Sequence, residues 1–118
     1  MSNTNMSICS IVHGLGGSQV EVYLFSFGRL MSIQDVVAEI GISNYQLADG
    51  EESWLFANQN PEVGKQFFIV AKRVFAFSGE GPSIIYYDAA TKTFRHENVS
   101  FYGHIFSTAF RFLCKKKS

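Results

Sequence analysis

Two runs with the pattern of β-strands lie near the start of the chain. They span residues 7–13 and 18–27, and in the second run Val20, Val22 and Leu24 fall on every other position, which is the period of a β-strand. Residues 14–17, Gly-Leu-Gly-Gly, separate the two runs. A glycine-rich break between strand patterns is typical of a hairpin loop, so we expect an antiparallel strand pair here.

The period changes to that of a helix at residue 33. Hydrophobic residues recur there at i, i+3, i+4 and i+7, namely Ile33, Val36, Val37 and Ile40. Ser32 precedes them as an N-cap with Asp35 three residues later, and Gly41 follows as a C-terminal cap. The sequence therefore predicts a helix over residues 33–40.

Between residues 45 and 64 the pattern weakens. We expect a short strand over residues 45–48, a turn at Asp49-Gly50, and an apolar patch over residues 54–56. A loop containing Pro61 is expected to follow over residues 58–64. This interpretation places Glu51 and Glu52 in a solvated loop.

Strand patterns return after residue 66. Residues 67–78 are strongly β, although Lys72-Arg73 interrupts the run and indicates a bulge or an edge. Residues 79–82, Gly-Glu-Gly-Pro, form a turn signal. Residues 84–88 and 92–96 then predict a second hairpin.

Residues 100–114 fit two patterns. The first is a helix face made by Phe101, Ile105, Ala109 and Phe112. The second is strand alternation through Tyr102, His104, Phe106, Thr108, Phe110 and Phe112. The choice stays open with the helix favoured, because the lysines at 115–117 would complement the negative end of its dipole.

Together these elements predict a single α+β domain, with an antiparallel β-sheet of about five to six strands and two helices. The domain is expected to span residues 7–114, after a disordered N-terminus over residues 1–6 and before a basic tail over residues 115–118. The length of 118 residues suits one domain. Twelve Phe, five Tyr and one Trp can fill its core.

Charge is divided unevenly along the chain, although ten bases balance ten acids. Residues 1–64 hold one base, Arg29, against seven acids, whereas residues 65–118 hold nine bases against three acids. The halves therefore carry −6 and +6. Neutrality excludes only a uniformly basic or acidic surface.

The acidic half predicts a surface for a basic protein partner, because a field of one sign accelerates and orients association. Trp54, beside the acids, is a candidate anchor, with core packing as its alternative role. The predicted partner-binding residues are Asp35, Glu39, Asp49, Glu51, Glu52, Trp54 and Glu62. The alternative is that the acidic and basic halves pack against each other, within one molecule or in a homodimer.

The chain shows no catalytic or metal-binding pattern. Cys9 and His13, four residues apart on one strand, would lie about 13 Å from each other, too far for proton transfer. The three histidines are scattered and show no metal-ligand spacing. We therefore expect a protein with no catalytic residue, metal or cofactor. The alternative is a small enzyme or ligand-binding module that has a pocket near Cys9, His13 or His104.

Two further features concern partners and compartment. Arg111 and the lysines at 115–117 form a basic end, but the aromatic residues follow core periodicity, so nucleic acid is not an expected partner. The N-terminus lacks a secretory pattern and no apolar run could span a bilayer. We expect a cytoplasmic protein, with no membrane partner, in which Cys9 and Cys114 are reduced.

Four segments resemble the SUKH superfamily of bacterial immunity proteins: residues 30–36 as a serine-capped helix start, 75–81 as a strand into a turn, 86–94 as a hairpin, and 106–113 as a closing helix. The family's N-terminal helix with its Leu-Pro signature has no counterpart, because two predicted strands take its place. The resemblance implies an α+β protein that neutralises a toxin by binding it. We therefore expect a non-enzymatic inhibitor of a basic toxin, such as a nuclease.

Overall fold

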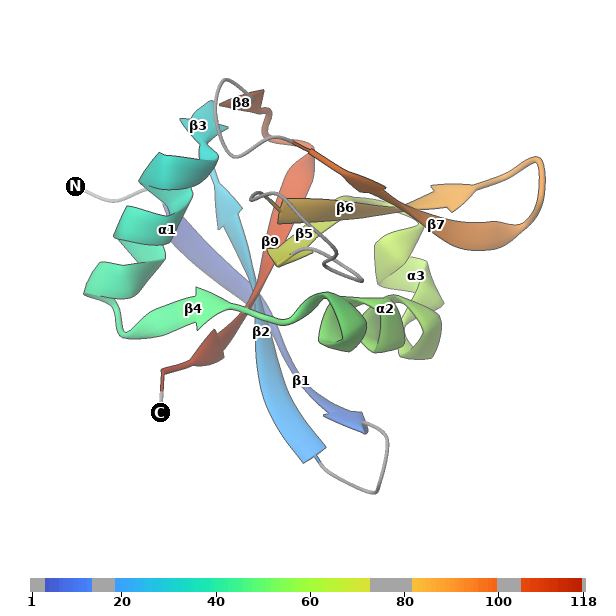
Figure 1. The fold of residues 1–118 in the computed structure, drawn as a ribbon, viewed down its shortest axis with the longest axis horizontal. Helices are drawn as coiled ribbons and strands as arrows, with labels where there is room; N and C mark the ends of the chain where they lie inside the picture. Colours follow the sequence, from blue (N-terminus) through green and yellow to red (C-terminus); the bar gives the residue numbers. More distant parts are fainter. Residues whose placement is uncertain (1–3, 14–18, 73–81, 100–104, 118) are drawn as a thin grey trace.

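The computed structural model describes residues 4–13, 19–72, 82–99 and 105–117, with residues 4–13 described by their backbone. The described elements run along the chain as β1 (Thr4–His13), β2 (Gln19–Phe27), β3 (Met31–Ser32), α1 (Ile33–Ile42), β4 (Tyr45–Leu47), α2 (Gly50–Gln59), α3 (Pro61–Gly64), β5 (Phe68–Lys72), β6 (Pro82–Asp88), β7 (Thr93–Asn98), β8 (Ile105–Phe106) and β9 (Phe110–Lys116). Figure 1 shows their arrangement.

The α+β fold class is confirmed, and one sheet organises the molecule. Its strands lie in the order β1-β2-β9-β5-β6-β7, and β4 also pairs with β9. Strands β5 and β9 are parallel, while the other pairs are antiparallel. The sheet is therefore mixed, not purely antiparallel as predicted, because β9 enters it from the distant C-terminal end of the chain.

The favoured helix over residues 100–114 is wrong for the described part of that segment, which forms β8 and β9. Strand β9 lies in the middle of the sheet between β2 and β5. Phe112 and Leu113 are both buried, one in each of two hydrophobic clusters. A strand buried on both faces has a nearly continuous apolar run, which a helix also tolerates.

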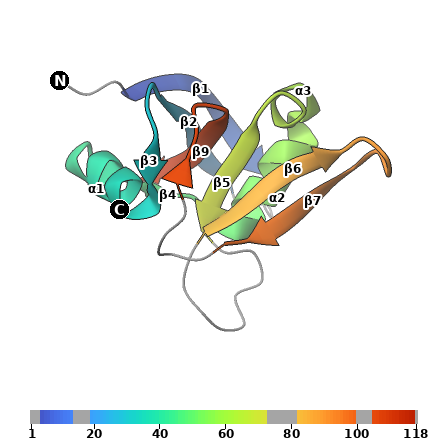
Figure 2. The same cartoon turned by 90° about the horizontal axis from the view of Figure 1, so that it is seen from above.

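The two clusters place helices on both faces of the sheet. Tyr23, Phe25 and Phe27 of β2 pack with residues of α1, whereas Val22 and Leu24 pack with residues of α2. Alternate residues of a strand point to opposite faces, so α1 covers one face and α2 the other. In Figure 2, β9 and β5 lie between α1 and the α2–α3 pair.

Helix α1 confirms the predicted helix and continues two residues further. Ser32 caps it, and its Oγ accepts a hydrogen bond from the Asp35 N–H at 3.2 Å. Gly41 lies inside the helix, and the left-handed conformation expected there is adopted by Asn44, with φ 67°. Asparagine tolerates that conformation well, so the turn needs no glycine.

Helix α2 corrects the predicted Asp49-Gly50 turn and the solvated loop after it. Asp49 is its N-cap, and the Glu52 Oε1 accepts a hydrogen bond from the Asp49 N–H at 2.7 Å. This pair is a capping box, an arrangement that satisfies backbone N–H groups at a helix start. The loop predicted over residues 58–64 is also wrong, because α2 ends at Gln59 and α3 begins at Pro61.

The predicted strand pairs are confirmed where they are described. β1 pairs with β2, and β6 pairs with β7, both antiparallel. β1 begins at Thr4, within the expected disordered start, and Lys115 and Lys116 lie in β9 where a basic tail was expected. β5 ends at Lys72, and the rest of the strand predicted over residues 67–78 lies outside the described residues, as does the predicted hairpin loop over residues 14–17. Of the turn predicted over residues 79–82, only Pro82 is described, and it begins β6.

Candidate binding surface

The seven predicted partner-binding residues do not form one face. Asp35 and Glu39 lie on α1, and Glu62 lies on the short helix α3. The remaining four gather at the start of α2: Asp49, Glu51, Glu52 and Trp54. Because α1 and α2 pack on opposite faces of the sheet, the acidic half of the sequence becomes two separate surfaces.

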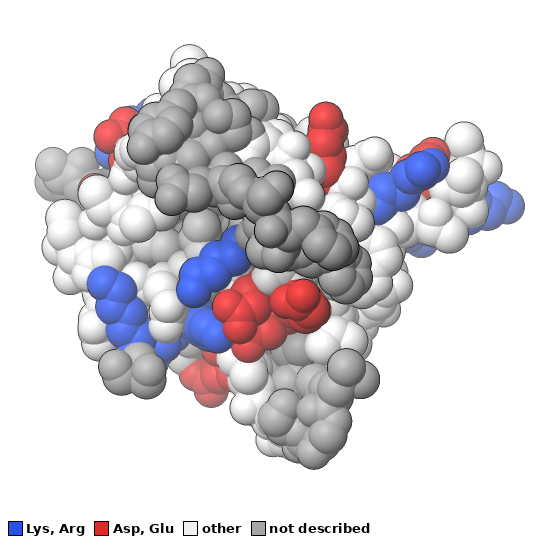
Figure 3. All heavy atoms as spheres, in the orientation of Figure 1, with Lys and Arg blue, Asp and Glu red and all other residues white. Residues whose placement is uncertain are grey.

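Lysines from two strands approach the start of α2. The Lys115 Nζ lies 3.1 Å from the Glu52 Oε1 and 3.2 Å from the Asp49 Oδ2. The Lys72 Nζ lies 3.8 Å from the Asp49 Oδ1, and both of these side chains are about half exposed. Figure 3 shows acidic and basic side chains next to one another on this face of the molecule. At this point the acidic and basic halves of the chain pack against each other within one molecule.

Lys115 is the centre of this ion-pair cluster. Its side chain is 22% exposed and that of Glu52 15%, so water screens the pair little. Burial by itself lowers the pKa of Lys115, but the hydrogen bonds to Glu52 and Asp49 and the negative charges of these two carboxylates together hold the pKa above its usual value. Lys115 therefore stays charged at neutral pH and ties β9 to the start of α2.

Glu51 differs from its two acidic neighbours. It is exposed in the first turn of α2, and no described Lys or Arg lies within ion-pair distance of it. A carboxylate in the first turn is stabilised by the positive end of the helix dipole. Glu51 is therefore the acid of this group that can face a partner at no cost to the fold.

Trp54 lies three residues after Glu51 and is half-buried. One side of it packs against the hydrophobic cluster that contains Phe56 and Leu113, which agrees with the core-packing role. Its ring also meets His96 edge-on, with the ring centroids 5.9 Å apart. Trp54 thus belongs partly to the core and partly to the surface.

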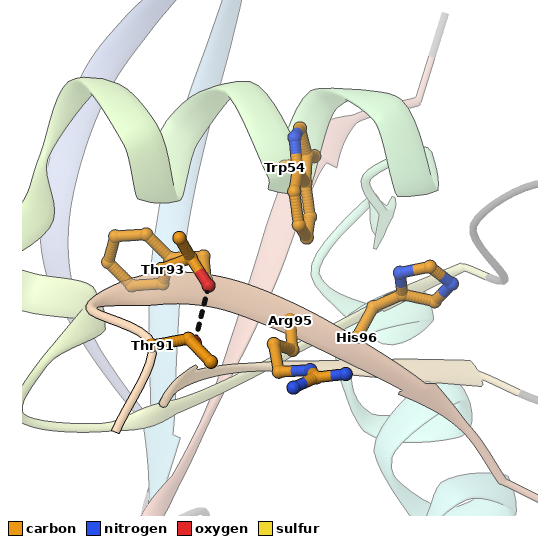
Figure 4. A pocket seen from close by; sticks show the side chains of 6 residues that line it. Trp54, Thr91, Thr93, Arg95 and His96 are labelled. Atoms are coloured by element: carbon orange, nitrogen blue, oxygen red, sulfur yellow. Dashed lines mark hydrogen bonds between the residues drawn. The ribbon is translucent and has the colours of Figure 1, made fainter. Parts of the chain in front are cut away.

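Trp54 borders a pocket between α2 and β7. The pocket has a volume of about 500 Å³ and is lined by Trp54, Thr91, Thr93, Phe94, Arg95 and His96. In Figure 4, Trp54 points from α2 toward β7. A second pocket of about 390 Å³ shares Trp54, Thr93 and Phe94 with the first and adds Lys65, Tyr87 and Lys92. We call the two adjoining pockets the β7 groove. The sequence does not predict this groove, because no local signal places α2 beside β7.

The described residues show no catalytic constellation. They contain no group of three His, Cys, Asp or Glu residues that could hold a metal ion. Cys114 is free and fully buried, and burial raises the pKa of its thiol far above the usual value. The thiolate is the reactive form of cysteine, so Cys114 is an inert core residue. The structure does not describe the side chains of Cys9, His13 and His104, so the alternative pocket predicted near them lies outside the described residues.

Comparison with protein-family models, with curated proteins and with solved structures finds no match. None of these comparisons bears on the expected resemblance to the SUKH superfamily. In the segments that suggested it, residues 30–36 lead into a serine-capped helix and residues 86–94 form a hairpin. Residues 106–113 contain the end of β8, a short connection and the first part of β9, not a closing helix. Among the described residues, no helix is both long and apolar enough to cross a membrane.

Proposed function

We propose that this protein is a non-enzymatic, protein-binding inhibitor of the immunity type, which neutralises a basic partner such as a nuclease toxin. The supporting observation is a stripe along α2. Glu51, Trp54 and Asn58 follow one another at helical spacing, and the first is an exposed acid while the second is a half-buried tryptophan. A large aromatic residue flanked by polar groups is the usual composition of a binding hot spot.

The acids of the surface have different roles in this proposal. Asp49 and Glu52 cap α2 and bind Lys115, so they position the helix. Glu51 supplies the charge that meets the partner. Asp35 and Glu39 lie on the opposite face of the sheet, where salt screening over about 8 Å limits their effect on a partner bound at α2.

A basic partner fits this surface for an electrostatic reason. Of the three carboxylates at the start of α2, Asp49 and Glu52 pair with two lysine ammonium groups, which leaves the negative charge of Glu51 unneutralised by a described ion pair. Nuclease clefts are positive because they bind phosphates. An exposed acid beside an aromatic anchor can occupy such a cleft and exclude its substrate.

The test begins with capture of the partner from the native host by the immobilised protein. Its affinity is then measured for the wild type, Glu51→Lys and Trp54→Ala, with Glu39→Lys on α1 as the matched charge-reversal control. We expect Glu51→Lys to weaken binding by about tenfold, mainly through slower association at low salt. Trp54→Ala should weaken it by at least as much.

Three results would contradict the proposal. The captured protein could be acidic at its binding site, the association rate could be independent of salt, or Glu39→Lys could weaken binding as much as Glu51→Lys. Circular dichroism of each variant ensures that a loss of binding is not a loss of fold.

A further inference from the structure

Strand β7 ends the main sheet. β6 pairs with it along one side through six residue pairs, and no described strand pairs with its other side. The larger pocket of the β7 groove is bordered by Thr93, Phe94, Arg95 and His96 in succession. Successive residues of a strand point to opposite faces, so a pocket that touches four of them in a row lies along the strand's edge.

An apolar side chain could be held beside this edge. Trp54 extends from α2 toward β7 (Figure 4) and, with Phe94, packs on the outer part of the α2-side core. Both side chains are half-buried, so each leaves ring surface in the groove. A strand edge with a neighbouring aromatic pocket has the two features that recognise an extended peptide: main-chain pairing and side-chain selection.

The groove is positively charged. It is lined by Arg95, Lys65 and Lys92, and none of its described lining residues is Asp or Glu. Arg95 pairs with Asp88 at 3.1 Å, but its side chain is 56% exposed, and such surface pairs are weak. The Lys65 Nζ lies 4.9 Å from the centre of the Tyr87 ring, which holds its charge over the groove wall.

Lys92 has an unusual backbone conformation. Its φ is 58°, in the left-handed region, and the other described non-glycine residue with positive φ is an asparagine. Glycine or asparagine would adopt this conformation with less strain. A lysine here is a poor choice for the turn alone, and its side chain lines the groove. Backbone strain of this kind collects at binding sites.

We infer that the β7 groove binds an extended acidic segment of a partner protein by adding it as a strand to β7. The segment's backbone pairs with the side of β7 on which no described strand lies, an apolar side chain contacts Trp54 and Phe94, and its carboxylates face Lys65, Lys92 and Arg95. A peptide fits better than single-stranded nucleic acid, because the described lining of the groove holds three Lys and Arg side chains and the strand edge offers backbone groups that a nucleic acid cannot pair with in register.

This site differs from the acidic one in its charged residues, although Trp54 and Asn58 belong to both. The basic partner proposed above is met by Glu51, whereas the acidic segment is met by cations on the β6–β7 hairpin and α3–β5 connection. Either proposal can therefore fail without the other. Glu51→Lys is expected to leave binding in the β7 groove unchanged, and Lys92→Gly to leave binding of the basic partner unchanged.

Trp54 gives a direct readout, because it is the only tryptophan of the chain. The probe is a short, end-capped peptide of alternating Glu and Val, and the control is the same peptide with Lys in place of Glu. We expect the acidic peptide to change Trp54 fluorescence saturably, and the basic peptide not to. On binding, hydrogen exchange of the β7 backbone amides should slow, as strand addition requires.

Lys92→Gly is the decisive variant. Glycine adopts the φ of residue 92 without strain, so the variant should fold at least as stably as the wild type while losing a groove cation. We expect it to raise the Kd of the acidic peptide several-fold, whereas the control Lys117→Gly, outside the groove, should not change it. The double variant Lys65→Gln/Lys92→Gly should raise the Kd by about tenfold or more.

Four outcomes would overturn the inference. Lys92→Gly could bind the acidic peptide as the wild type does, or both peptides could bind equally. An oligo-dT strand could saturate the Trp54 signal while the acidic peptide leaves it unchanged, which would assign the groove to nucleic acid. Finally, the β7 amides could become more protected from exchange as the protein concentration rises, without any peptide, while sedimentation shows a dimer. That result would assign the edge of β7 to a second copy of the chain.

Discussion

Removing the Lys115 ammonium group should measurably weaken the attachment of α2 to β9. Lys115→Met keeps most of the stem and deletes the charge. The Lys115–Glu52 pair joins side chains that are 22% and 15% exposed at 3.1 Å, and a hydrogen bond to a charged group in such a place contributes about 1.5–3 kcal/mol. The Asp49 side chain is 49% exposed, so its pair adds about 0–1 kcal/mol. We expect a total loss of about 2 kcal/mol.

Urea denaturation monitored by Trp54 fluorescence measures this loss. Lys116→Met is the matched control, because Lys116 is the next residue of the same strand and is exposed; it should cost less than about 0.5 kcal/mol. For a domain of this size, Lys115→Met should lower Tm by roughly 5–10 °C. Equal stabilities of the two variants would refute the structural role given to the ion-pair cluster.

The pH dependence gives the same prediction a second, independent check. The folded state holds the pKa of Lys115 above its usual value, and a raised lysine pKa stabilises the fold at every pH below the unfolded value of about 10.4. That contribution is lost as the pH rises through the folded pKa. The stability difference between wild type and Lys115→Met should therefore be constant from pH 7 to about pH 10 and shrink above it; a difference that grows in alkali would contradict the assignment.

Three further predictions concern the fold. Gly64→Ala should destabilise the protein by about 1–3 kcal/mol, because its Cβ would lie 2.5 Å from a Phe94 ring carbon. Gly41→Ala should stabilise it by about 0.5–1 kcal/mol, because residue 41 lies inside α1 and the added Cβ would be in ordinary van der Waals contact, 3.5 Å from the Lys117 Nζ. Thermal melts would compare the two variants. Ser32→Ala removes the α1 N-cap and should cost about 1 kcal/mol in urea denaturation. Cys114, fully buried, should resist thiol reagents until the protein unfolds, as peptide-level mass spectrometry would show; rapid labelling of native protein would contradict its burial.

Local signals predicted the elements whose neighbours in space are also neighbours in sequence. Helix α1 carries its own cap at Ser32 and a complete apolar stripe, and each hairpin joins strands separated by a short loop. α2 was missed although it also has a local signal. The Asp49–Glu52 spacing fits a capping box and so predicts a helix start. The Asp49-Gly50 pair predicts a turn instead, because that pair is common in turns.

The surface at α2 shows where sequence reasoning stops. Counting charges found the acids Asp49 and Glu52, yet their partner Lys115 lies 66 and 63 positions away along the chain. Nothing local relates these residues. They meet because β4 and β9 pair in a register that sets Gln46 opposite Lys115. The structure therefore changes two candidate partner-binding acids into supports of the helix and leaves Glu51 as the exposed one.

The sequence by itself determined the α+β class, helix α1, the two hairpins and the division of charge between the two halves, because periodicity, caps and composition are written in neighbouring residues. The tertiary structure alone decided that the last segment is a central strand, that α2 and β7 border a basic groove, and that Lys115 neutralises part of the acidic surface. The first and the last of these depend on strand β9 returning from the end of the chain to lie between β2 and β5. The central position of β9 in the sheet buries both of its faces, which favours a strand over a helix there. The same position brings Lys115 beside the start of α2.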